Sequence, residues 1–353
     1  MSFATMRAVD ISPDAPHPPP ASSLYINHSI PRPVAKPNEC LIRVKAFGLN
    51  RADTLQRVGL YPLDPSWPKI MGLEFSGIIE EVGSEPRADR GLEWKVGDEV
   101  FGLAYGGCYA EFVAVHKRTI MKKPEKMSWG VAAGIPEVWF TSIQALYFVG
   151  NYSPTQTRTI LWHAAASAVS IAGIQLSLAA NSKLGHQPPR VYATARQDAK
   201  CSVATSLGAT AAINTTTTPS WSTELKRLNN GKGVDLVIDF LGASAFAQNL
   251  DVLALDGCIV QLGLMGGMML PEKVDISAFV LKRIRLEGST LRTRDVEYQG
   301  RLLDMFEENV LEWLVGGQFK SGVETIVAWD EVGEMHGRLE RNETKGKIVC
   351  LVD

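Results

Sequence analysis

The stretch from Thr159 to Ala180, TILWHAAASAVSIAGIQLSLAA, is the feature that most constrains the fold of this chain. A short apolar run, Ile160–Trp162, is followed by a turn of small residues and a helical pattern with one apolar side, made of Ile171, Ile174, Gln175 and Leu178. A dinucleotide-binding unit begins with this order of strand, tight turn and helix. The free N–H groups and the dipole at the start of the helix bind the pyrophosphate. The glycines that usually form this turn are absent, since it reads Ser167-Ala168-Val169-Ser170.

The residues after the next predicted strand, Val191–Ala195, indicate which dinucleotide is preferred. An NAD-preferring unit usually carries Asp or Glu there to bind the ribose hydroxyls. Here Arg196 and Gln197 follow the strand, with Lys200 one helical turn on. Two cations without a carboxylate favour a 2′-phosphate and hence NADPH, and Asp198 is expected to cap the following helix. The alternative is that Arg196 and Lys200 are solvated surface charges.

The missing glycines predict weakened NADPH binding rather than none. Glycine lets such a turn adopt unusual dihedrals and approach a phosphate closely, whereas β-carbons at Ala168 and Ser170 narrow that space. The hydroxyls of Ser167 and Ser170 are expected to donate to phosphate oxygens and so to compensate in part. Two later loops, Phe240–Gly242 and Leu262–Gly267, are expected at the same edge of the sheet, where ligands bind in open α/β sheets.

The order of predicted elements divides the chain into two domains. The first ~130 residues contain short strands between Gly and Pro turns. These are Glu39–Phe47, Gly77–Val82, Glu99–Leu103 and Tyr109–Val115. From about Glu137, strands alternate with helices, which predicts a parallel sheet covered on both faces. The strands are Ile160–His163, Val191–Ala195, Val234–Asp239, Cys258–Gly263 and Leu286–Thr290, and the helices are Glu137–Phe148, one ending near Ala180, Asp198–Leu207, Ser244–Leu253 and Ile276–Lys282.

The last part of the chain is assigned to the first domain again. It contains a helix, Glu297–Val315, and a strand, Lys347–Val352. The first domain is therefore expected to comprise residues 1–136 and 296–353, and the second residues 137–295. Within the second domain the segment Asn181–Arg190 looks inserted.

Composition and charge argue against several kinds of partner. Lys and Arg total 36 against 38 Asp and Glu, a net charge of -2, so no basic field attracts nucleic acid or an anionic membrane. The five cysteines are scattered, which is typical of free thiols in a reducing compartment. The first ten residues lack the long apolar stretch of a signal peptide or membrane span. A cytosolic protein with neither nucleic-acid nor membrane partners is expected.

Motifs for metal binding or nucleophilic catalysis are absent from the sequence. It contains no His-Glu-x-x-His, no Cys-x-x-Cys and no Gly-x-Ser-x-Gly, so neither zinc nor a serine triad is predicted. His116, His163 and His336 are isolated and expected to be structural. Tyr61 lies in a loop bounded by Gly and Pro, where its hydroxyl is placed to hydrogen-bond a substrate carbonyl or quinone oxygen. The alternative is a tyrosine packed over the domain core.

These motifs together resemble the zinc-free quinone oxidoreductases of the medium-chain dehydrogenase/reductase superfamily, especially the zeta-crystallin-like group that includes the p53-inducible quinone oxidoreductase. The matching segments run nearly end to end: LNRADTLQRVGLYP, MGLEFSGIIEEVG, WKVGDEVFGL, AAGIPEVWFTSIQAL, ALDGCIVQLGLMGG and NETKGKIV. In zinc alcohol dehydrogenases of this superfamily, the segment matching Asn50–Asp53 carries a ligand cysteine, and a Gly-His-Glu motif supplies the next ligand. Here these read NRAD and Gly72-Leu73-Glu74, so both ligands are absent.

The resemblance implies an α/β protein with a GroES-like, β-rich catalytic domain, a Rossmann domain with a doubly wound parallel sheet, and a cleft between them for NADPH and the quinone. It implies that Tyr61 and Asn50 are catalytic, with Tyr61 donating to the reduced oxygen. The implied cofactor residues are Asn50, Thr141, Ser167, Ala168, Val169, Arg196, Lys200, Gly242, Leu264, Met265, Leu291 and Asn342. Many members are dimers, so a homodimer is expected.

The chain departs from the family in its cofactor turn, which is usually Ser/Gly-Gly-Val-Gly, and in Arg196-Gln197, which is usually Gly-Ser. A tyrosine often found near the 2′-phosphate is replaced around Asn214-Thr215. The prediction is a metal-free NADPH-dependent reductase of a quinone, in particular an ortho-quinone, or of an enone. Three alternatives remain open: an enoyl reductase acting on thioester-bound enones, a non-catalytic nucleotide-binding homologue with a degraded turn, and an RNA-binding protein.

Overall fold

The computed structural model describes residues 4–85, 93–153, 155–182, 187–270 and 273–353, so residues 183–186 of the inserted-looking segment lie outside the described part. The chain divides into two compact units. Unit 1 comprises Met1–Phe140 and Arg292–Asp353, and unit 2 comprises Thr141–Leu291. Each boundary lies four residues from the expected one, at 140 against 136 and at 291 against 295.

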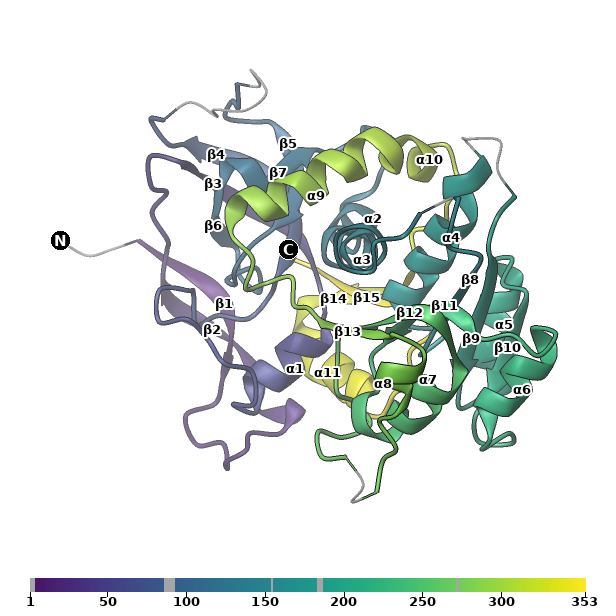
Figure 1. Ribbon diagram of the computed structural model, residues 1–353. Helices are drawn as coiled ribbons and strands as arrows, with labels where there is room; N and C mark the ends of the chain where they lie inside the picture. The colour runs from purple at the N-terminus through teal and green to yellow at the C-terminus, as the bar shows by residue number, and fades with distance from the viewer. Residues whose placement is uncertain (1–3, 86–92, 154, 183–186, 271–272) are drawn as a thin grey trace. The chain divides into compact units, whose positions relative to one another are not determined.

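Unit 2 is built on a six-stranded parallel sheet in the order β10-β9-β8-β11-β12-β13, flanked by helices (Figure 1). Numbered within the unit, this order is 3-2-1-4-5-6, which is the doubly wound dinucleotide-binding topology and confirms the predicted fold. The strands are β8 Thr159–Trp162, β9 Arg190–Ala195, β10 Ala211–Asn214, β11 Val234–Asp239, β12 Leu253–Gln261 and β13 Arg285–Gly288. The helices are α4 Ala168–Ser182, α5 Asp198–Ser206, α6 Trp221–Leu228, α7 Phe246–Val252 and α8 Ala278–Leu281.

The start of unit 2 is held together by close packing of α4 on β8. All four residues of β8 are buried, as expected of a parallel strand covered on both faces. A β-carbon at Gly173 would lie 2.0 Å from the Trp162 ring, so only glycine lets the helix approach the strand this closely. Residues 170–177 are all buried, and the helix therefore has no polar face there. Ile171, Ile174 and Gln175 of the predicted side are buried, and the opposite side of α4 is buried as well because the helix is enclosed there.

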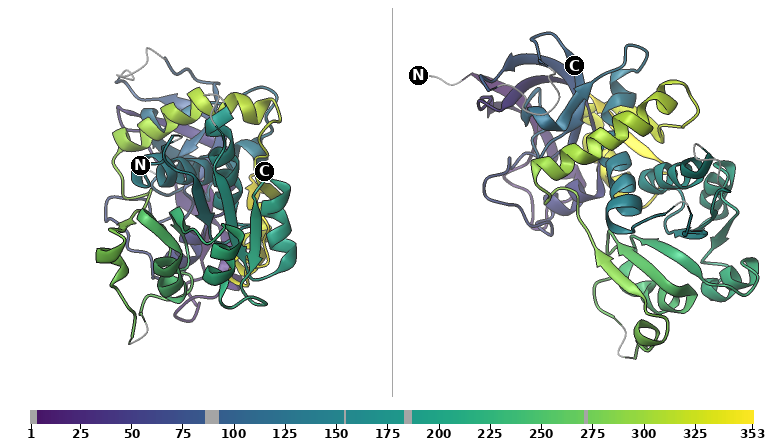
Figure 2. Two further views of the ribbon diagram at one scale, coloured as in Figure 1. Left: turned by 45° about the vertical axis from the view of Figure 1, so that its right-hand side comes forward. Right: turned by 45° about the horizontal axis from the view of Figure 1, so that its top comes forward.

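Unit 1 contains a seven-stranded sheet in the order β14-β15-β3-β4-β5-β7, with β6 paired to β3, and a separate β1-β2 pair (Figure 2). Neighbouring strands are antiparallel except β14 and β15. The strands are β1 Thr5–Ile11, β2 Leu24–Pro31, β3 Glu39–Gly48, β4 Glu74–Val82, β5 Glu99–Leu103, β6 Phe112–His116, β7 Ile120–Lys122, β14 Val323–Ala328 and β15 Lys347–Leu351. The core includes Phe47, stacked on Tyr109 with ring centroids 4.3 Å apart.

The helices of unit 1 are α1 Arg51–Arg57, α2 Trp129–Ala133, α9 Val296–Asn309, α10 Leu311–Val315 and α11 Val332–Glu340. α3, Pro136–Ile143, continues across the boundary between the units into a π-helical segment, Gln144–Val149. The single helix expected over 297–315 is interrupted at Val310, whose φ of -123° leaves the helical region. None of the described helices combines the length and apolar character that crossing a bilayer requires.

Candidate functional site

The turn between β8 and α4 has backbone N–H groups without an acceptor among the described residues. Ser167 precedes the helix, and its Oγ accepts a hydrogen bond from the N–H of Ser170 at 3.1 Å. Among the described residues, no acceptor is within reach of the N–H groups of Ala168 and Val169. Ser167, Ala168 and Val169 are partly exposed. A 15-residue helix that begins with two unpaired N–H groups on partly exposed residues has the features of an anion-binding helix start.

The serine hydroxyls of this turn do not have the role expected from the sequence. Ser170 is fully buried and its Oγ donates to the carbonyl of His163 at 2.7 Å. The Oγ of Ser167 donates to the Oγ of Ser170 at 2.8 Å. Each hydroxyl has one hydrogen, and both are used inside the turn. The prediction that these hydroxyls compensate for missing glycines is therefore wrong, and the groups of the turn that are left to bind a phosphate are backbone N–H groups.

Only one position of the turn has the dihedral that glycine favours. Ala164 has a φ of 51°, whereas Ala168 and Ser170 have negative φ values. The N–H of Ala165, which follows, donates to the carbonyl of Thr194 at 2.8 Å and ties the turn to the end of β9. Backbone strain in this turn is therefore located at Ala164, and the φ values do not test whether the β-carbons of Ala168 and Ser170 narrow the space for a phosphate.

A buried polar network joins the carboxyl ends of β8, β9 and β11 beneath the turn. The His163 ring lies 2.6 Å from Thr194 Oγ1 and 2.8 Å from Asn249 Oδ1, and Asn249 Nδ2 donates to Asp239 at 2.9 Å. Asp239 also accepts from the N–H of Leu241 at 2.6 Å. Burial lowers the pKa of His163, so the ring is neutral in this network. His163 is therefore structural, as predicted.

The tip after β9 carries exposed polar side chains. Arg196 and Gln197 are exposed, and Lys200 is partly buried. Asp198 is the first residue of α5 and not its cap, which is Gln197, so the predicted capping role is wrong. Its carboxylate instead accepts from Asn214 Nδ2 at 2.7 Å. Arg196 is the charged residue that directly follows β9.

The two glycine-containing loops meet at this edge of the sheet. Gly242 has a φ of 74°, and a β-carbon there would lie 2.8 Å from Leu264 Cδ2 and 2.9 Å from the carbonyl of Gly267. The N–H of Met265 donates to the carbonyl of Phe240 at 3.0 Å. Leu264 and Met265 remain about half exposed, at 47% and 46%. The structure thus brings Gly242, Leu264 and Met265 together.

The remaining predicted cofactor residues are spread over both units. In unit 2, Leu291 is buried, and Thr141 precedes Ser142, whose Oγ donates to the carbonyl of Val169 at 2.9 Å. In unit 1, Asn342 follows α11 with a φ of 56° and accepts from Arg51 Nη2 at 2.9 Å. Asn342 therefore stands close to α1 within unit 1.

In unit 1, Asn50 is held between two buried charges. Its Nδ2 donates to Glu74 Oε1 at 3.0 Å, and its Oδ1 accepts from Lys347 Nζ at 2.5 Å. Glu74 and Lys347 are both buried and form an ion pair. The backbone N–H of Asn50 donates to Asp53 at 2.8 Å. One N–H of the Asn50 side chain remains for a ligand.

Glu74 is part of this polar cluster. Besides Lys347 and Asn50 it accepts the N–H of Glu137 at 2.9 Å. Across the described ranges, no group of three or more His, Cys, Asp or Glu side chains is placed to bind a metal ion. Asp53 has a pKa raised to about 6 by burial, and it accepts from the N–H of Gly72 and from the Tyr109 hydroxyl, each at 3.0 Å.

Tyr61 lies beside a buried arginine that no sequence motif singles out. The Arg292 guanidinium is 5.3 Å from the Tyr61 ring centre and 5.0 Å from that of Trp67. Arg292 is held by the Tyr105 carbonyl at 2.8 Å and by Gln56 at 2.9 Å. Within the described structure, the Tyr61 hydroxyl forms no hydrogen bond to another residue. Burial raises its pKa, so the phenol remains neutral and able to donate a hydrogen bond.

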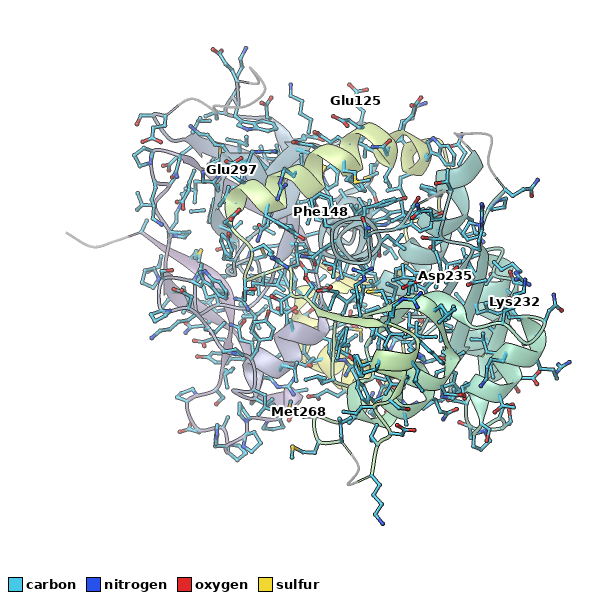
Figure 3. The ribbon with its side chains drawn as sticks, viewed as in Figure 1. Glu125, Phe148, Lys232, Asp235, Met268 and Glu297 are labelled. Atoms are coloured by element: carbon cyan, nitrogen blue, oxygen red, sulfur yellow. The ribbon has the colours of Figure 1, made fainter. Side chains whose placement is uncertain are left out.

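A hollow of about 680 Å³ lies at the other edge of the unit 2 sheet, where the strands begin. Its lining includes Arg190, Lys232 and Asp235, of which Lys232 and Asp235 are labelled in Figure 3. Asp235 accepts from the N–H groups of Arg158 and Thr159 at 2.8 Å each. None of the predicted site residues lines this hollow, so it is not part of the candidate site.

Comparison with known proteins agrees with both units. The family described as alcohol dehydrogenase GroES-like domain matches residues 36–125, and the family described as zinc-binding dehydrogenase matches residues 169–308. A probable quinone oxidoreductase of Schizosaccharomyces pombe is 30% identical over 338 residues, which cover 94% of each chain. The chain belongs to the medium-chain dehydrogenase/reductase superfamily.

Two further similar proteins show how far this likeness extends. The synaptic vesicle membrane protein VAT-1 homolog of Danio rerio is 29% identical over 337 residues, which cover 91% of this chain and 66% of the relative. The structure of Escherichia coli quinone oxidoreductase complexed with NADPH matches with a TM-score of 0.79 and 23% identity, over 99% of this chain and 100% of that one. These similarities confirm the predicted fold and the pyridine-nucleotide-binding type of unit 2.

Proposed function

We propose that the chain is an NADPH-dependent, metal-independent reductase that transfers a hydride to a quinone, in particular an ortho-quinone, or to a related conjugated carbonyl. The observation that carries the proposal is the start of α4, where the N–H groups of Ala168 and Val169 are unpaired among the described residues and Arg196 follows the adjacent strand. The relatives add support, since one is named a probable quinone oxidoreductase and one related structure contains NADPH.

Unit 2 would bind the cofactor, and unit 1 would bind the acceptor. In unit 2, the α4 N–H groups would hold the pyrophosphate, Arg196 and Lys200 the 2′-phosphate, and Gly242, Leu264 and Met265 the rest of the dinucleotide. NADPH supplies the hydride. In unit 1, the hydroxyl of Tyr61 would donate to the acceptor oxygen, and the remaining side-chain N–H of Asn50 would orient the ligand.

Metal independence is proposed from the residues that stand at the ligand positions of zinc-dependent relatives. Asn50-Arg51-Ala52-Asp53 carries no cysteine, and Gly72-Leu73-Glu74 carries no histidine. Glu74 is already bound by Lys347 and Asn50. We also propose a cytosolic location, supported by five cysteines that are all buried free thiols.

A homodimer is proposed from the edge strand β13. It ends the six-stranded sheet, and its exposed N–H and C=O groups are available to pair with another strand. Beside it, Val280, Leu281 and Leu286 are exposed at 80%, 72% and 43%. Light scattering that gives twice the chain mass would support the dimer, and a monomeric mass at micromolar concentration would contradict it.

The proposal is tested by fluorescence titration of the purified protein with NADPH and with NADH. We expect the protein to bind NADPH more tightly than NADH. Arg196→Ala is expected to lower the affinity for NADPH about 10- to 100-fold and to leave the affinity for NADH unchanged, because one charged hydrogen bond to the 2′-phosphate is lost. Arg227→Ala is the control, since Arg227 is an exposed arginine of the same unit that pairs with Glu224 at 2.7 Å. Failure of both nucleotides to bind would favour the non-catalytic homologue.

The acceptor is tested by following NADPH oxidation with an ortho-quinone, a simple enone and an enoyl thioester. The proposal expects turnover with the quinone or the enone. Turnover with the thioester alone would identify an enoyl reductase, which shares the fold, as the related structure of CurK enoyl reductase illustrates. If the protein retained RNA in a filter assay, and retention decreased as the salt concentration rose, the RNA-binding alternative would be favoured.

A further inference from the structure

The carboxyl group of Glu137 has no partner in a region where the neighbouring charges have one. Glu137 is the second residue of α3, and its backbone N–H donates to Glu74 at 2.9 Å. Its side chain, in contrast, forms no hydrogen bond or ion pair with any residue that the structure describes. The residue is partly exposed, so solvent reaches it. Glu74 also accepts from Asn50 Nδ2 at 3.0 Å, so Glu137 stands beside the polar cluster that holds the proposed ligand-orienting residue.

Burial and the neighbouring carboxylates favour the protonated form of Glu137, and the two nearby cations oppose it. The titratable groups that act on it or that it acts upon come from several parts of unit 1: Glu74, Lys347, Asp53, Arg292, Tyr61 and Cys108. The two cations are already committed, Lys347 to Glu74 and Asn50, and Arg292 to Tyr105 and Gln56. Burial, and next the carboxylate of Glu74, raise the pKa of Glu137 to about 8. At neutral pH it therefore holds a proton.

The other acidic groups of the cluster are unsuited to supplying a proton. Glu74 is held by Lys347, Asn50 and the backbone of Glu137, and Asp53 accepts three hydrogen bonds. Tyr61 has a pKa raised above the usual value of 10.0, so its hydroxyl donates a hydrogen bond and keeps its proton. A general acid works best when its pKa lies near the operating pH. Asp53 is fully buried and its oxygens are taken up by those three hydrogen bonds, whereas the carboxyl of Glu137 is unpartnered among the described residues and partly exposed.

We propose that Glu137 is the general acid that protonates the oxygen of the reduced acceptor, while Tyr61 hydrogen-bonds to that oxygen. This inference rests on the proposed function. The nicotinamide nucleotide supplies the hydride with its electron pair, and the acceptor oxygen then carries a negative charge. The O–H bond of Glu137 breaks as a new O–H bond forms on the acceptor, and water returns a proton to the Glu137 carboxylate through its exposed side.

The test compares Glu137→Gln with two other variants. Glutamine keeps the size of the side chain and removes the transferable proton, and Glu137→Asp keeps the acid. Glu297→Gln is the matched control, because Glu297, labelled in Figure 3, is also the second residue of a helix, α9, but is exposed and lies outside the cluster. Three readouts are used: NADPH binding, the pH profile of kcat with a quinone acceptor, and the titration of the Glu137 carboxyl by NMR in protein without ligands.

We expect Glu137→Gln to bind NADPH as the wild type does and to lower kcat about 10²-fold, with Glu137→Asp recovering part of the loss. The wild-type rate should fall above about pH 8, and this fall should be absent in Glu137→Gln. The NMR signal of the carboxyl should titrate near the same pH. The control Glu297→Gln should keep the wild-type rate and pH profile.

Three results would overturn the inference. Equal kcat and equal pH profiles of the wild type and Glu137→Gln would exclude the acid role while the proposed function stands. A Glu137 carboxyl that is ionised at about pH 6 in the ligand-free protein would exclude it independently of turnover. Wild-type protein that transfers no hydride to any acceptor would refute the proposed function, and the acid role with it.

Discussion

Replacing Glu137 by glutamine should change how the stability of the protein depends on pH. The wild-type carboxyl has a pKa of about 8 in the folded protein against the ordinary value of 4.5. Below pH 4.5 it is protonated in both folded and unfolded chains. Between pH 4.5 and 8 the unfolded chain releases the proton and the folded chain retains it, so the free energy of unfolding falls as pH rises. Glu137→Gln lacks this dependence.

The size of the effect follows from the difference between the folded and unfolded pKa values. A difference of one pH unit corresponds to about 1.4 kcal/mol, so a pKa raised from 4.5 to about 8 lowers the free energy of unfolding by at most about 5 kcal/mol. Between about pH 5.5 and about pH 7.5, the wild type should lose about 3 kcal/mol of unfolding free energy relative to Glu137→Gln. The difference in unfolding free energy between the two proteins should then stay constant above about pH 8. This is a large fraction of the stability of an ordinary domain.

Urea unfolding of the wild type and Glu137→Gln, in steps of about one pH unit from about pH 5.5 to about pH 8.5, measures the difference. Taking the difference between the two proteins cancels the contributions of titrating groups that do not interact with Glu137, such as His336, whose pKa is lowered to about 3 by burial. Glu297→Gln should show no such gap, since its side chain is 77% exposed. A gap between the wild type and Glu137→Gln that is constant with pH would refute the reasoning, because it would mean that Glu137 titrates like a solvated carboxyl.

Two further variants test other parts of the structure. Tyr61→Phe should lower kcat with a quinone about 10²-fold without changing the affinity for NADPH, because it removes one hydrogen-bond donor to the developing charge. Steady-state kinetics measure kcat, and an unchanged kcat would exclude the role of Tyr61 as a donor. Ala164→Gly should raise the free energy of unfolding by about 0.5–1 kcal/mol, since Ala164 has a φ of 51°, whereas Ala166→Gly, without a positive φ, should lower it. Urea unfolding compares the two, and equal effects would contradict the strain argument.

Much of unit 2 was predictable because its strands and helices are encoded locally. The buried run of β8, the following turn and α4 were evident from Thr159–Ala180, and Val234–Asp239 was predicted with the bounds observed for β11. β10 and β14 were missed because short or half-exposed strands carry little periodicity. The break at Val310 was missed because a continuous helical pattern runs through it.

The residues of the candidate site were predicted less completely than the fold. The cofactor residues around Ser167, Gly242 and Leu264 could be named from motifs, but the use of the two serine hydroxyls inside the turn could not. Glu137 lies in a segment that carried the family resemblance, yet nothing in the sequence set it apart as an acid. Arg292, next to the predicted Leu291, was likewise missed.

The sequence by itself determined the parallel-sheet unit, the β-rich unit, the absence of zinc ligands at the two usual motifs and the cationic end of β9. These depend on residue periodicity, turn chemistry and the identity of side chains at fixed positions. The tertiary structure alone decided that Asn50 is held by Glu74 and Lys347, which are 24 and 297 residues away in the chain, and that Glu137 is left without a partner among the described residues. Charge pairing and burial depend on residues far apart in the sequence, and they set which carboxyl keeps its proton.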